Sequence, residues 1–385
     1  MSTLKVGAIR GVSASSDAVT VANDGTCTAN ITNNLSNRNL IINGAMQVAQ
    51  RGTSSTSNGY HSVDRFKMET SNITHNSTKS RGDLSSSDTG PFEVGFRHYA
   101  RIALSQAGVV AANSGVEIQQ RIEAQNIAMS GWNYGSASSN ITLQFWFRCS
   151  TNQTFYGYLY SFDGTAQVYT FSFTASGNNT WTKITKTIPG NSNLTFNNDN
   201  GPGLQLKLIP FYGTDFTNNK TLDQWAAYDS ANQMPDMAST WLTAGASTFD
   251  LAGVQLEVGS TATDFEHRSF GQELQLCQRY CFVTNQGGCG HGVGGGSNAV
   301  HRCQMNLPVV MRAAPSVTMN GSSMHTYDGS ATAQFNAFSV VHTLPHAIDW
   351  ETSDSERTGG SVTAYRPVIA YIKSDSGGVI CSAEL

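Results

Sequence analysis

The chain has 385 residues, more than a single hydrophobic core usually serves, and this length predicts two or three domains. Charged residues make up only 13% of the chain and the formal net charge is −4, so we expect no basic surface and no nucleic-acid partner. There is no apolar run of about 18 residues, and we expect no membrane insertion. Residues 1–20 also lack the apolar run of a secretory signal.

The composition favours an all-β protein. Gly is high at 37 residues, Ser, Thr and Asn are abundant, and the helix-forming residues Glu and Lys are scarce. Aromatic residues make up 10% of the chain, which is enough to build a hydrophobic core and excludes a disordered polar segment.

The cysteines are odd in number and scattered along the chain. They are Cys27, Cys149, Cys277, Cys281, Cys289, Cys303 and Cys381. Without a secretory signal, such a set is not the disulfide framework of a secreted protein. We expect reduced thiols that are mostly buried as small hydrophobic side chains.

Residues 1–59 do not contain enough apolar surface for a domain of their own. Residues 1–38 predict short extended pieces separated by Gly and Asn-Asp-Gly turns, which need a partner chain or subunit to become ordered. Residues 39–59 begin apolar and become rich in Ser and Thr, which is typical of a connector that docks on the next domain.

Strand patterns follow one another densely over residues 60–268. They occur at 64–69, 99–104, 116–123, 141–149, 155–162, 168–174, 181–188, 204–212 and 248–258. Regular strands separated by turn residues, with few helical patterns, predict a jelly-roll β-sandwich. Two polar insertions, 70–92 and 213–246, are expected to interrupt it, and Arg81-Gly82-Asp83 in the first is interpreted as a turn.

The periodicity changes over residues 269–282. Phe270, Leu274, Cys277 and Cys281 are spaced by four, three and four residues, which predicts a short linking helix with one apolar seam. About three helical turns are marginal alone, so we expect the seam to pack against copies of itself around a threefold axis.

A smaller β domain is predicted over residues 283–385, with strands at 300–307, 316–319, 333–341 and 365–373. It opens with a glycine-rich stretch that contains Gly290-x-Gly292-x-x-Gly295. A β-like segment follows where a nucleotide-binding fingerprint needs a helix, so we interpret the stretch as a glycine loop.

The same stretch carries a candidate metal site made of Cys289, His291, His301 and Cys303. Two Cys and two His are able to close a tetrahedral zinc site, although each pair is separated by only one residue where zinc sites prefer two to four. Alternatives are that the histidines of several chains meet on a symmetry axis, or that these are small and polar residues around a loop. Apart from this structural metal ion, no cofactor is expected.

Six aromatic residues are candidates for contact with a carbohydrate or receptor. They are Trp132, Tyr134, Tyr212, Trp225, Tyr228 and Trp241, all in or beside predicted loops. Rings at the rim of a jelly roll stack on sugar faces, and nearby Asn and Asp bond to hydroxyl groups. The alternative is that the rings cap the core or an intersubunit contact.

Nothing in the sequence predicts a catalytic site. Asp264 and Glu266 are close in sequence but lie where the predicted jelly roll ends, whereas glycoside hydrolysis needs two acids that face each other across a cleft. There is no Gly-x-Ser-x-Gly nucleophile elbow. We therefore expect the protein not to be an enzyme.

Several segments resemble a family of bacteriophage tail fibre and virion structural proteins, of marine or cyanophage type. The segments are 39–52 (NLIINGAMQVAQRG) with Tyr60 and 63–66 (VDRF), then 251–259 (LAGVQLEVG), 262–266 (ATDFE), 267–270 (HRSF), 273–280 (ELQLCQRY), 311–315 (MRAAP) and 383–385 (AEL). The resemblance implies an N-terminal virion anchor, a jelly roll like that of carbohydrate-binding modules, and a distal β domain.

The resemblance also implies a function. It implies a homotrimeric tail fibre of the virion, attached to the phage tail through residues 1–38, that recognises a host surface glycan or protein receptor. Assembly in the host cytoplasm agrees with unpaired cysteines. The alternatives are a capsid-bound fibre or decoration protein and a polysaccharide-degrading tailspike, and the absence of a long β-helix repeat counts against the tailspike.

Overall fold

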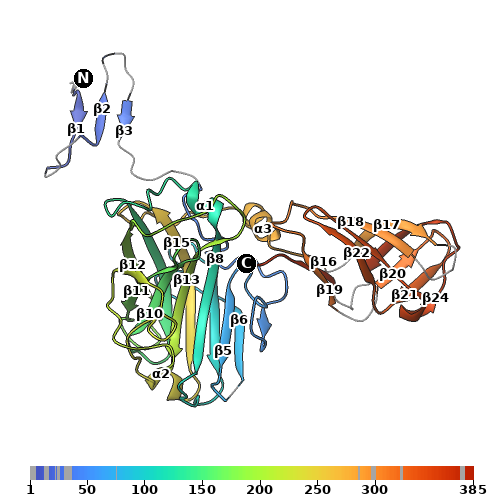
Figure 1. Cartoon of the computed structure of the whole chain (residues 1–385), viewed down its shortest axis with the longest axis horizontal. Coiled ribbons are helices and arrows are strands. Elements are labelled where there is room, and N and C mark those ends of the chain that lie inside the picture. Colours follow the sequence, from blue (N-terminus) through green and yellow to red (C-terminus); the bar gives the residue numbers. More distant parts are fainter. Residues whose placement is uncertain are drawn as a thin grey trace.

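A computed structural model describes residues 6–12, 17–21, 23, 27–29, 37–74, 76–284, 287–295, 301–320, 324–372 and 378–385. The remaining residues, which include most of the predicted anchor, lie outside the described part. Nearly all the regular structure is β, as the composition predicts (Figure 1). Among the described residues, no helix has the length and apolar character needed to cross a bilayer.

A small antiparallel sheet lies at the N-terminus and stands apart from the rest of the chain in Figure 1. It consists of β1 (Ala8–Ile9), β2 (Val19–Val21) and β3 (Cys27–Ala29), in that order. Val6, Ile9, Val12 and Val21 are exposed. These strands are the short extended pieces that the sequence predicts, and they bury little apolar surface.

Residues 54–258 contain two six-stranded antiparallel sheets that pack face to face as a jelly roll. The β10 sheet has the order β14 (Trp225–Ala227), β11 (Gln167–Phe173), β10 (Phe155–Ser161), β13 (Pro202–Tyr212), β8 (Gly115–Glu123) and β5 (Lys67–Ser71). The β9 sheet has the order β12 (Thr182–Pro189), β9 (Asn140–Cys149), β15 (Thr248–Val258), β7 (His98–Leu104), β6 (Ser77–Asp83) and β4 (Ser54–Ser55). Two short helices, α1 (Ala124–Ala128) and α2 (Thr240–Thr243), interrupt the connections.

The jelly-roll core is a cluster of aromatic rings contributed by both sheets. Phe147 on β9 packs edge-on against Phe173 on β11 with ring centroids 4.9 Å apart. Phe155 on β10 and Phe249 on β15 pack in the same way at 5.4 Å. These side chains are fully or almost fully buried because alternate residues of each strand point between the sheets.

A segment that looks polar in the sequence is part of the sandwich. Residues 77–83, predicted to be in an insertion, form β6, which pairs with β7 and β4. Lys79 on β6 is 2% exposed, and its Nζ donates to the carbonyl of Thr56 at 3.1 Å. The interpretation of Arg81-Gly82-Asp83 as a turn is therefore wrong, because the tripeptide ends a strand.

Residues 39–52 dock on the sandwich. The linking helix comes after the last strand of the sandwich in the chain. Ile41 and Met46 are fully buried, and Asn39 Nδ2 donates to the carbonyl of Val254 at 3.2 Å. The linking helix α3 (Phe270–Gln278) begins with a capping box, in which the Ser269 side chain accepts from the backbone of Gln272 and the Gln272 side chain accepts from the backbone of Ser269.

The C-terminal domain combines a three-stranded and an eight-stranded antiparallel sheet (Figure 1). The first has the order β16 (Cys281–Thr284), β26 (Gly378–Ser382) and β19 (Ser316–Asn320). The second has the order β22 (Ser339–Leu344), β23 (Ala347–Glu351), β18 (His301–Asn306), β17 (Gly287–Gly294), β25 (Pro367–Ile372), β20 (Met324–Tyr327), β21 (Thr332–Phe335) and β24 (Arg357–Gly360), and the 3₁₀ helix η1 (Asp354–Glu356) precedes β24.

The predicted glycine loop is instead the central strand β17. It pairs with β18 on one side and β25 on the other. A Cβ atom on Gly292 would lie 1.8 Å from the carbonyl oxygen of Arg302, so the neighbouring strand approaches too closely for any side chain. The glycines therefore permit close strand packing rather than a turn.

A buried joint connects the jelly roll to α3 and the C-terminal domain. We define the joint as Arg51, Arg65, Glu123, Arg279, Tyr280 and Glu384. Arg65 is 1% exposed, pairs with Glu384 and stacks over the Tyr280 ring at 3.4 Å. Glu123 accepts from Arg279 at 2.7 and 2.8 Å and from the Tyr280 hydroxyl at 2.6 Å.

The end of the chain returns to this joint. Arg51 Nη1 donates to Glu384 at 3.1 Å, and the Tyr60 hydroxyl donates to the carbonyl of Leu385 at 3.0 Å. The C label in Figure 1 accordingly lies against the jelly roll and not at the far end of the C-terminal domain. Arg312 of the C-terminal domain donates to the carbonyl of Glu384 at 3.2 Å, so contacts from both domains fix residues 384–385 in place.

Six described cysteines are free thiols and are buried, as the sequence predicts. They are Cys149, Cys277, Cys281, Cys289, Cys303 and Cys381. Burial raises the pKa of Cys149, Cys289, Cys303 and Cys381 to about 12, so these thiols stay protonated at neutral pH. The side chain of Cys27 lies outside the described part of the chain.

Candidate functional site

The outer surface of the β10 sheet carries a row of tyrosines. On β10, Phe155 and Leu159 point into the core, so Tyr156, Tyr158 and Tyr160 point outward. The strand register places Tyr158 beside Lys207 of β13, and Lys207 beside Gln119 of β8. We call this surface the tyrosine face, and its members are Tyr156, Tyr158, Tyr160, Tyr212, Tyr228, Glu117, Gln119, Gln205 and Lys207.

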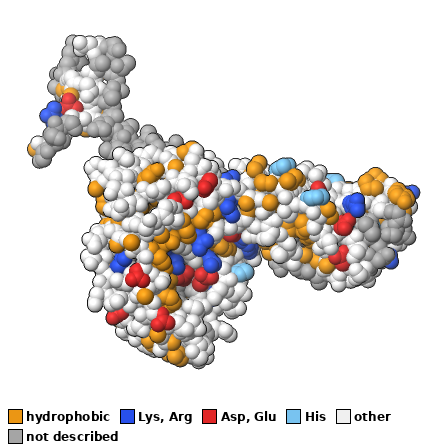
Figure 2. All heavy atoms as spheres, viewed as in Figure 1, with side chains coloured by type: hydrophobic (Ala, Val, Ile, Leu, Met, Phe, Trp, Pro, Cys, Tyr) orange, Lys and Arg blue, Asp and Glu red, His pale blue; other side chains and the backbone are white. Residues whose placement is uncertain are grey.

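Hydrogen bonds hold the polar members of the tyrosine face in place. Lys207 Nζ donates to Glu117 at 2.9 Å and to the Tyr212 hydroxyl at 3.1 Å, and the Tyr212 hydroxyl donates to Glu117. Gln119 Nε2 donates to Glu117 at 3.0 Å, and Gln205 donates to Gln119. In Figure 2, charged side chains of both signs gather in the middle of the jelly roll, over β13, β8 and β5. The network orients these groups before any ligand arrives.

One half of the tyrosine face is covered by the segment that follows β13. Tyr158 is 2% exposed, and its hydroxyl donates to Gln233 Oε1 at 3.1 Å. The carbonyl of Gln233 accepts from Thr170 at 2.7 Å, and Met234 is fully buried beside them. This half therefore belongs to the packing of the domain.

The other half ends in three rings that solvent reaches, which we call the ring cluster: Tyr160, Phe162 and Tyr228. Tyr160 packs edge-on against Phe162 at 4.7 Å and against Tyr228 at 4.8 Å. Tyr228 is 36% exposed. The Arg121 guanidinium lies 5.2 Å from the centre of the Phe162 ring, and Gln205 is the register partner of Tyr160. The cluster thus combines aromatic surface with a nearby cation, while Gln205 lies almost fully buried beneath it.

The phenol groups of Tyr158, Tyr212 and Tyr228 remain protonated at neutral pH. Burial is the main cause that raises the pKa of Tyr158 and Tyr212 well above the ordinary value for tyrosine, and the nearby Glu117 carboxylate adds to both shifts. Burial also raises the pKa of Tyr228, with Tyr160 and Glu117 as further causes. These hydroxyls therefore act as neutral hydrogen-bond donors and acceptors.

The six aromatic residues predicted to contact a ligand differ in how far the structure buries them. Trp241 is fully buried and Trp132 nearly so, and their indole nitrogens donate to the carbonyls of Thr248 at 2.9 Å and Ser139 at 3.2 Å. These two rings cap the core, which corrects their assignment as ligand contacts, because the loops that carry them fold inward.

The other four predicted aromatics differ in exposure. Tyr134 packs edge-on against Phe196 at 4.9 Å, and Trp225 is half-buried with its indole nitrogen donating to the carbonyl of Pro189 at 2.7 Å. Tyr212 belongs to the buried network and Tyr228 to the exposed ring cluster. The strand tyrosines 156, 158 and 160 were missed, although an aromatic residue at every second position signals an aromatic strand face.

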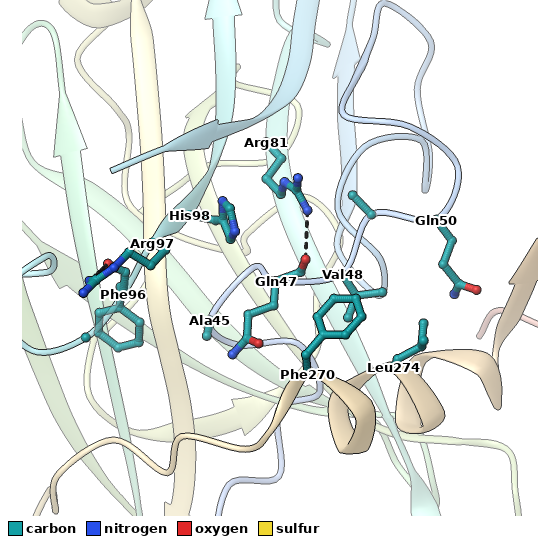
Figure 3. Close-up of a pocket in the computed structure, with 12 residues that line it drawn as sticks. Ala45, Gln47, Val48, Gln50, Arg81, Phe96, Arg97, His98, Phe270 and Leu274 are labelled. Carbon is teal, nitrogen blue, oxygen red and sulfur yellow. Dashed lines mark hydrogen bonds between the residues drawn. The ribbon is translucent and has the colours of Figure 1, made fainter. Parts of the chain in front are cut away.

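A cavity of about 570 Å³ lies beside α3, between this helix and residues 45–50 (Figure 3). Phe270 and Leu274 rise from α3 toward Val48, and Arg81 and His98 lie on the far side. Arg81 Nη1 donates to the carbonyl of Gln47 at 2.8 Å and so orders the wall. Phe270 remains 56% exposed.

The predicted helical seam is divided between two environments. Cys277 and Cys281 are fully buried within one chain, so they cannot line a seam between copies, and this part of the prediction is corrected. The reason is that Glu273, Cys277 and Tyr280 form the face of the helical segment that packs on the jelly roll. Phe270 and Leu274 lie on the flank of that face, where they line the cavity.

The four predicted metal ligands do not form a common site. His301 and Cys303 lie on the buried side of β18, and Cys289 is buried with its Sγ 3.7 Å from the sulfur of Met324. His291 is exposed on the opposite side of the sheet. In the part of the chain that the structure describes, no three His, Cys, Asp or Glu side chains are grouped to hold a metal ion. The residues present therefore do not fit a tetrahedral zinc site.

Comparison with known proteins gives matches to structure alone. No model of a protein family matches the sequence, and no curated protein matches it. Among solved structures, the chain is similar to the enzymatically active domain of bacteriophage CBA120 tailspike protein 4, with 11% identity, 57% of this chain covered and a TM-score of 0.31. That match spans only 21% of the tailspike chain.

Carbohydrate-binding modules match in the same range. The module TmCBM61 in complex with β-1,4-galactotriose has 6% identity and a TM-score of 0.30, and the match covers 58% of this chain and 99% of the module. The family 11 module of a Clostridium thermocellum cellulase has 9% identity and a TM-score of 0.26, with 56% and 98% covered. Similarity this low does not indicate a function for this chain, so the function is inferred from its residues.

Proposed function

We propose that the protein is a carbohydrate-binding structural subunit of a bacteriophage particle. In this proposal it is a homotrimeric tail fibre that is anchored through residues 1–38 and contacts a host surface glycan with the jelly roll. The ring cluster at the exposed edge of the tyrosine face is the observation that supports the glycan-binding part of this proposal. The phage part depends on the sequence resemblance and on the separate N-terminal sheet.

The ring cluster has the chemistry that a saccharide requires. The C–H surface of a sugar ring stacks on aromatic rings, and its hydroxyl groups need donors and acceptors nearby. Tyr160 and Tyr228 supply rings and hydroxyls, Gln205 lies beside Tyr160, and Arg121 supplies a cationic donor. Because the polar groups behind the rings are already hydrogen-bonded to one another, binding does not have to order them.

Binding can be measured by isothermal titration calorimetry of the full chain against soluble trisaccharides to hexasaccharides of glucose, galactose and N-acetylglucosamine. The double variant Tyr160→Ala/Tyr228→Ala is expected to weaken binding at this face about ten-fold or more, since two stacking surfaces are lost. Tyr365→Ala is the matched control, because Tyr365 is 77% exposed in the C-terminal domain. Equal affinity of the double variant and the control for every saccharide would refute glycan binding at the tyrosine face.

Trimer formation is proposed to use the exposed flank of α3. Phe270 and Leu274 offer apolar surface beside the cavity, which an apolar side chain of a second copy can fill. Light scattering of the purified chain should give three times the monomer mass, and Phe270→Asp should lower it to that of the monomer. A wild-type chain that stays monomeric at micromolar concentration would contradict the trimer.

The place of the protein in the particle is tested separately. Deleting residues 1–38 should leave a soluble, folded protein that no longer joins the phage particle. A label on the N-terminus, located on intact particles by electron microscopy, distinguishes attachment to the tail from attachment to the capsid. Incorporation of the truncated chain into particles would show that residues 1–38 are not the anchor.

A further inference from the structure

A second cavity lies on the outer side of the β9 sheet, on the opposite face of the sandwich from the tyrosine face. Its volume is about 620 Å³, within the usual range of ligand sites. Its lining comes from the loop that precedes β7, from β9, β12 and β15, and from residues 264–267. We call it the Trp146 cavity.

A bulge in β15 makes room for this cavity. The register between β15 and β9 shifts between Ala252 and Gln255, and Gly253 adopts a positive φ of 58° within the bulge. A Cβ atom at Gly253 would lie 2.4 Å from the Phe96 ring, so only glycine fits there. The strand thus contributes backbone to the lining, with Phe96 packed directly on it.

Aromatic rings form the walls. Trp146 points outward from β9 and is half-buried, with Lys183 and Ala252 as its partners on the two neighbouring strands. Phe265 packs edge-on against Phe96 at 4.7 Å and against His267 at 4.9 Å. His267 is fixed by a contact of 2.9 Å between its Nε2 and the carbonyl of Val94. The walls are therefore held in position by packing.

Polar groups of both charge signs surround the rings. The carboxyl groups of Glu93 and Asp264 and the ammonium group of Lys183 belong to exposed residues, and all three residues line the cavity. Gln144 is 2% exposed, and its Nε2 donates to the carbonyl of Thr263 at 2.6 Å. Donors and acceptors around an aromatic wall suit a ligand that has many hydroxyl groups and no net charge.

We propose that the Trp146 cavity is a second saccharide site, which takes a short neutral oligosaccharide with one sugar ring stacked on Trp146. This site goes beyond the proposed function, since it does not depend on the ring cluster. Each chain would then hold two glycan contacts on opposite faces of the jelly roll. In an assembly of several copies, this arrangement would multiply weak contacts with a polysaccharide.

The test uses the full chain, the same saccharide panel and two independent variants of the cavity. Trp146→Ala should weaken binding at one of two sites at least ten-fold, so that the calorimetric stoichiometry falls from two to one per chain. Asp264→Asn changes an exposed side chain and should weaken the same site about three-fold without a change in the melting temperature. The Asp264→Asn variant still tests the site if the half-buried Trp146 cannot be replaced without loss of folding.

The double variant Tyr160→Ala/Tyr228→Ala separates this proposal from the proposed function. It should retain one site, which Trp146→Ala then removes. Binding that is lost in the double variant and unchanged in both cavity variants would overturn the Trp146 site and leave the tyrosine face standing. Binding that is lost only in the cavity variants would overturn glycan binding at the tyrosine face and support the Trp146 site. No binding of any saccharide to the wild-type chain would overturn both.

Discussion

The joint and the ring cluster both place aromatic rings near an arginine, and they have opposite relations to solvent. In the joint, Arg65 is 1% exposed, and Glu123 and Tyr280 are fully buried. In the ring cluster, Tyr228 is 36% exposed and Tyr160 is half-buried. In the joint, charged and phenolic groups that are mostly buried connect two domains, whereas the phenolic rings at an open edge are available to a ligand.

Four of the eight segments that carry the sequence resemblance contribute residues to the joint. Residues 39–52, 63–66, 273–280 and 383–385 supply Arg51, Arg65, Arg279, Tyr280 and Glu384. Tyr160, Phe162 and Tyr228 lie outside every one of those segments. The resemblance segments therefore contain residues of the joint and, with Gly253, Asp264 and His267, of the Trp146 cavity, but none of the ring cluster.

Replacing Arg65 should have the largest effect on the joint. Arg65→Met leaves Glu384 buried with one cation fewer and removes the stacking on Tyr280, and we expect a loss of about 3–5 kcal/mol in the free energy of unfolding. Urea unfolding at pH 7 measures it. Arg302→Met is the control, because Arg302 pairs with Glu351 at 3.2 Å while its side chain is 80% exposed, and we expect a change within about 0.5 kcal/mol. Similar losses in both variants would show that the joint is not sealed.

Glu123 should make the joint sensitive to acid. Burial alone would raise the pKa of Glu123, but hydrogen bonds from Arg279 and Tyr280 outweigh it and lower the pKa below the ordinary value of 4.5. A lowered carboxyl pKa stabilises the fold above the unfolded-state pKa, and this stabilisation is lost as the pH falls through the folded-state pKa. Glu123→Gln should therefore cost about 2 kcal/mol at pH 7, and the difference from wild type should shrink toward pH 3.

Thermal unfolding of the wild-type chain and of Glu123→Gln between pH 7 and pH 3 measures this difference in stability. A difference that is the same at both ends of the pH range would mean that the charge of Glu123 does not stabilise the joint. Asp264→Asn, which changes an exposed carboxyl group, provides the control.

The ring cluster should show the smallest effect on stability. Tyr228→Ala removes a partly exposed ring that contacts Tyr160 at its edge, and we expect a loss of about 1 kcal/mol or less, alongside the weaker saccharide binding. A loss as large as that of Arg65→Met would identify Tyr228 as a core residue and remove it from the candidate site.

Strand periodicity predicts much of the fold. The pattern at 141–149 becomes β9 (Asn140–Cys149), and the predicted helix contains α3 (Phe270–Gln278). Failures occur where a neighbouring strand decides the structure. The polar residues 77–83 and the glycines of 287–294 both form strands, because partners on either side supply the hydrogen bonds that the local sequence does not encode.

The candidate site was harder to predict than the fold. Trp132 and Trp241 lie in polar sequence, yet their loops fold back over the core. Tyr160 and Tyr228 are far apart in sequence, and they meet only because β14 adds to the edge of the β10 sheet next to β11. Composition and spacing do not reveal which face of a strand is covered, so the site depends on tertiary structure.

The most direct test of the proposed function is an experimental structure of the full chain with a bound oligosaccharide from the panel. We expect a sugar ring stacked on Tyr160 or Tyr228, with a hydroxyl group within hydrogen-bonding distance of Arg121. A saccharide bound only in the C-terminal domain, or found cleaved in a cleft, would contradict it.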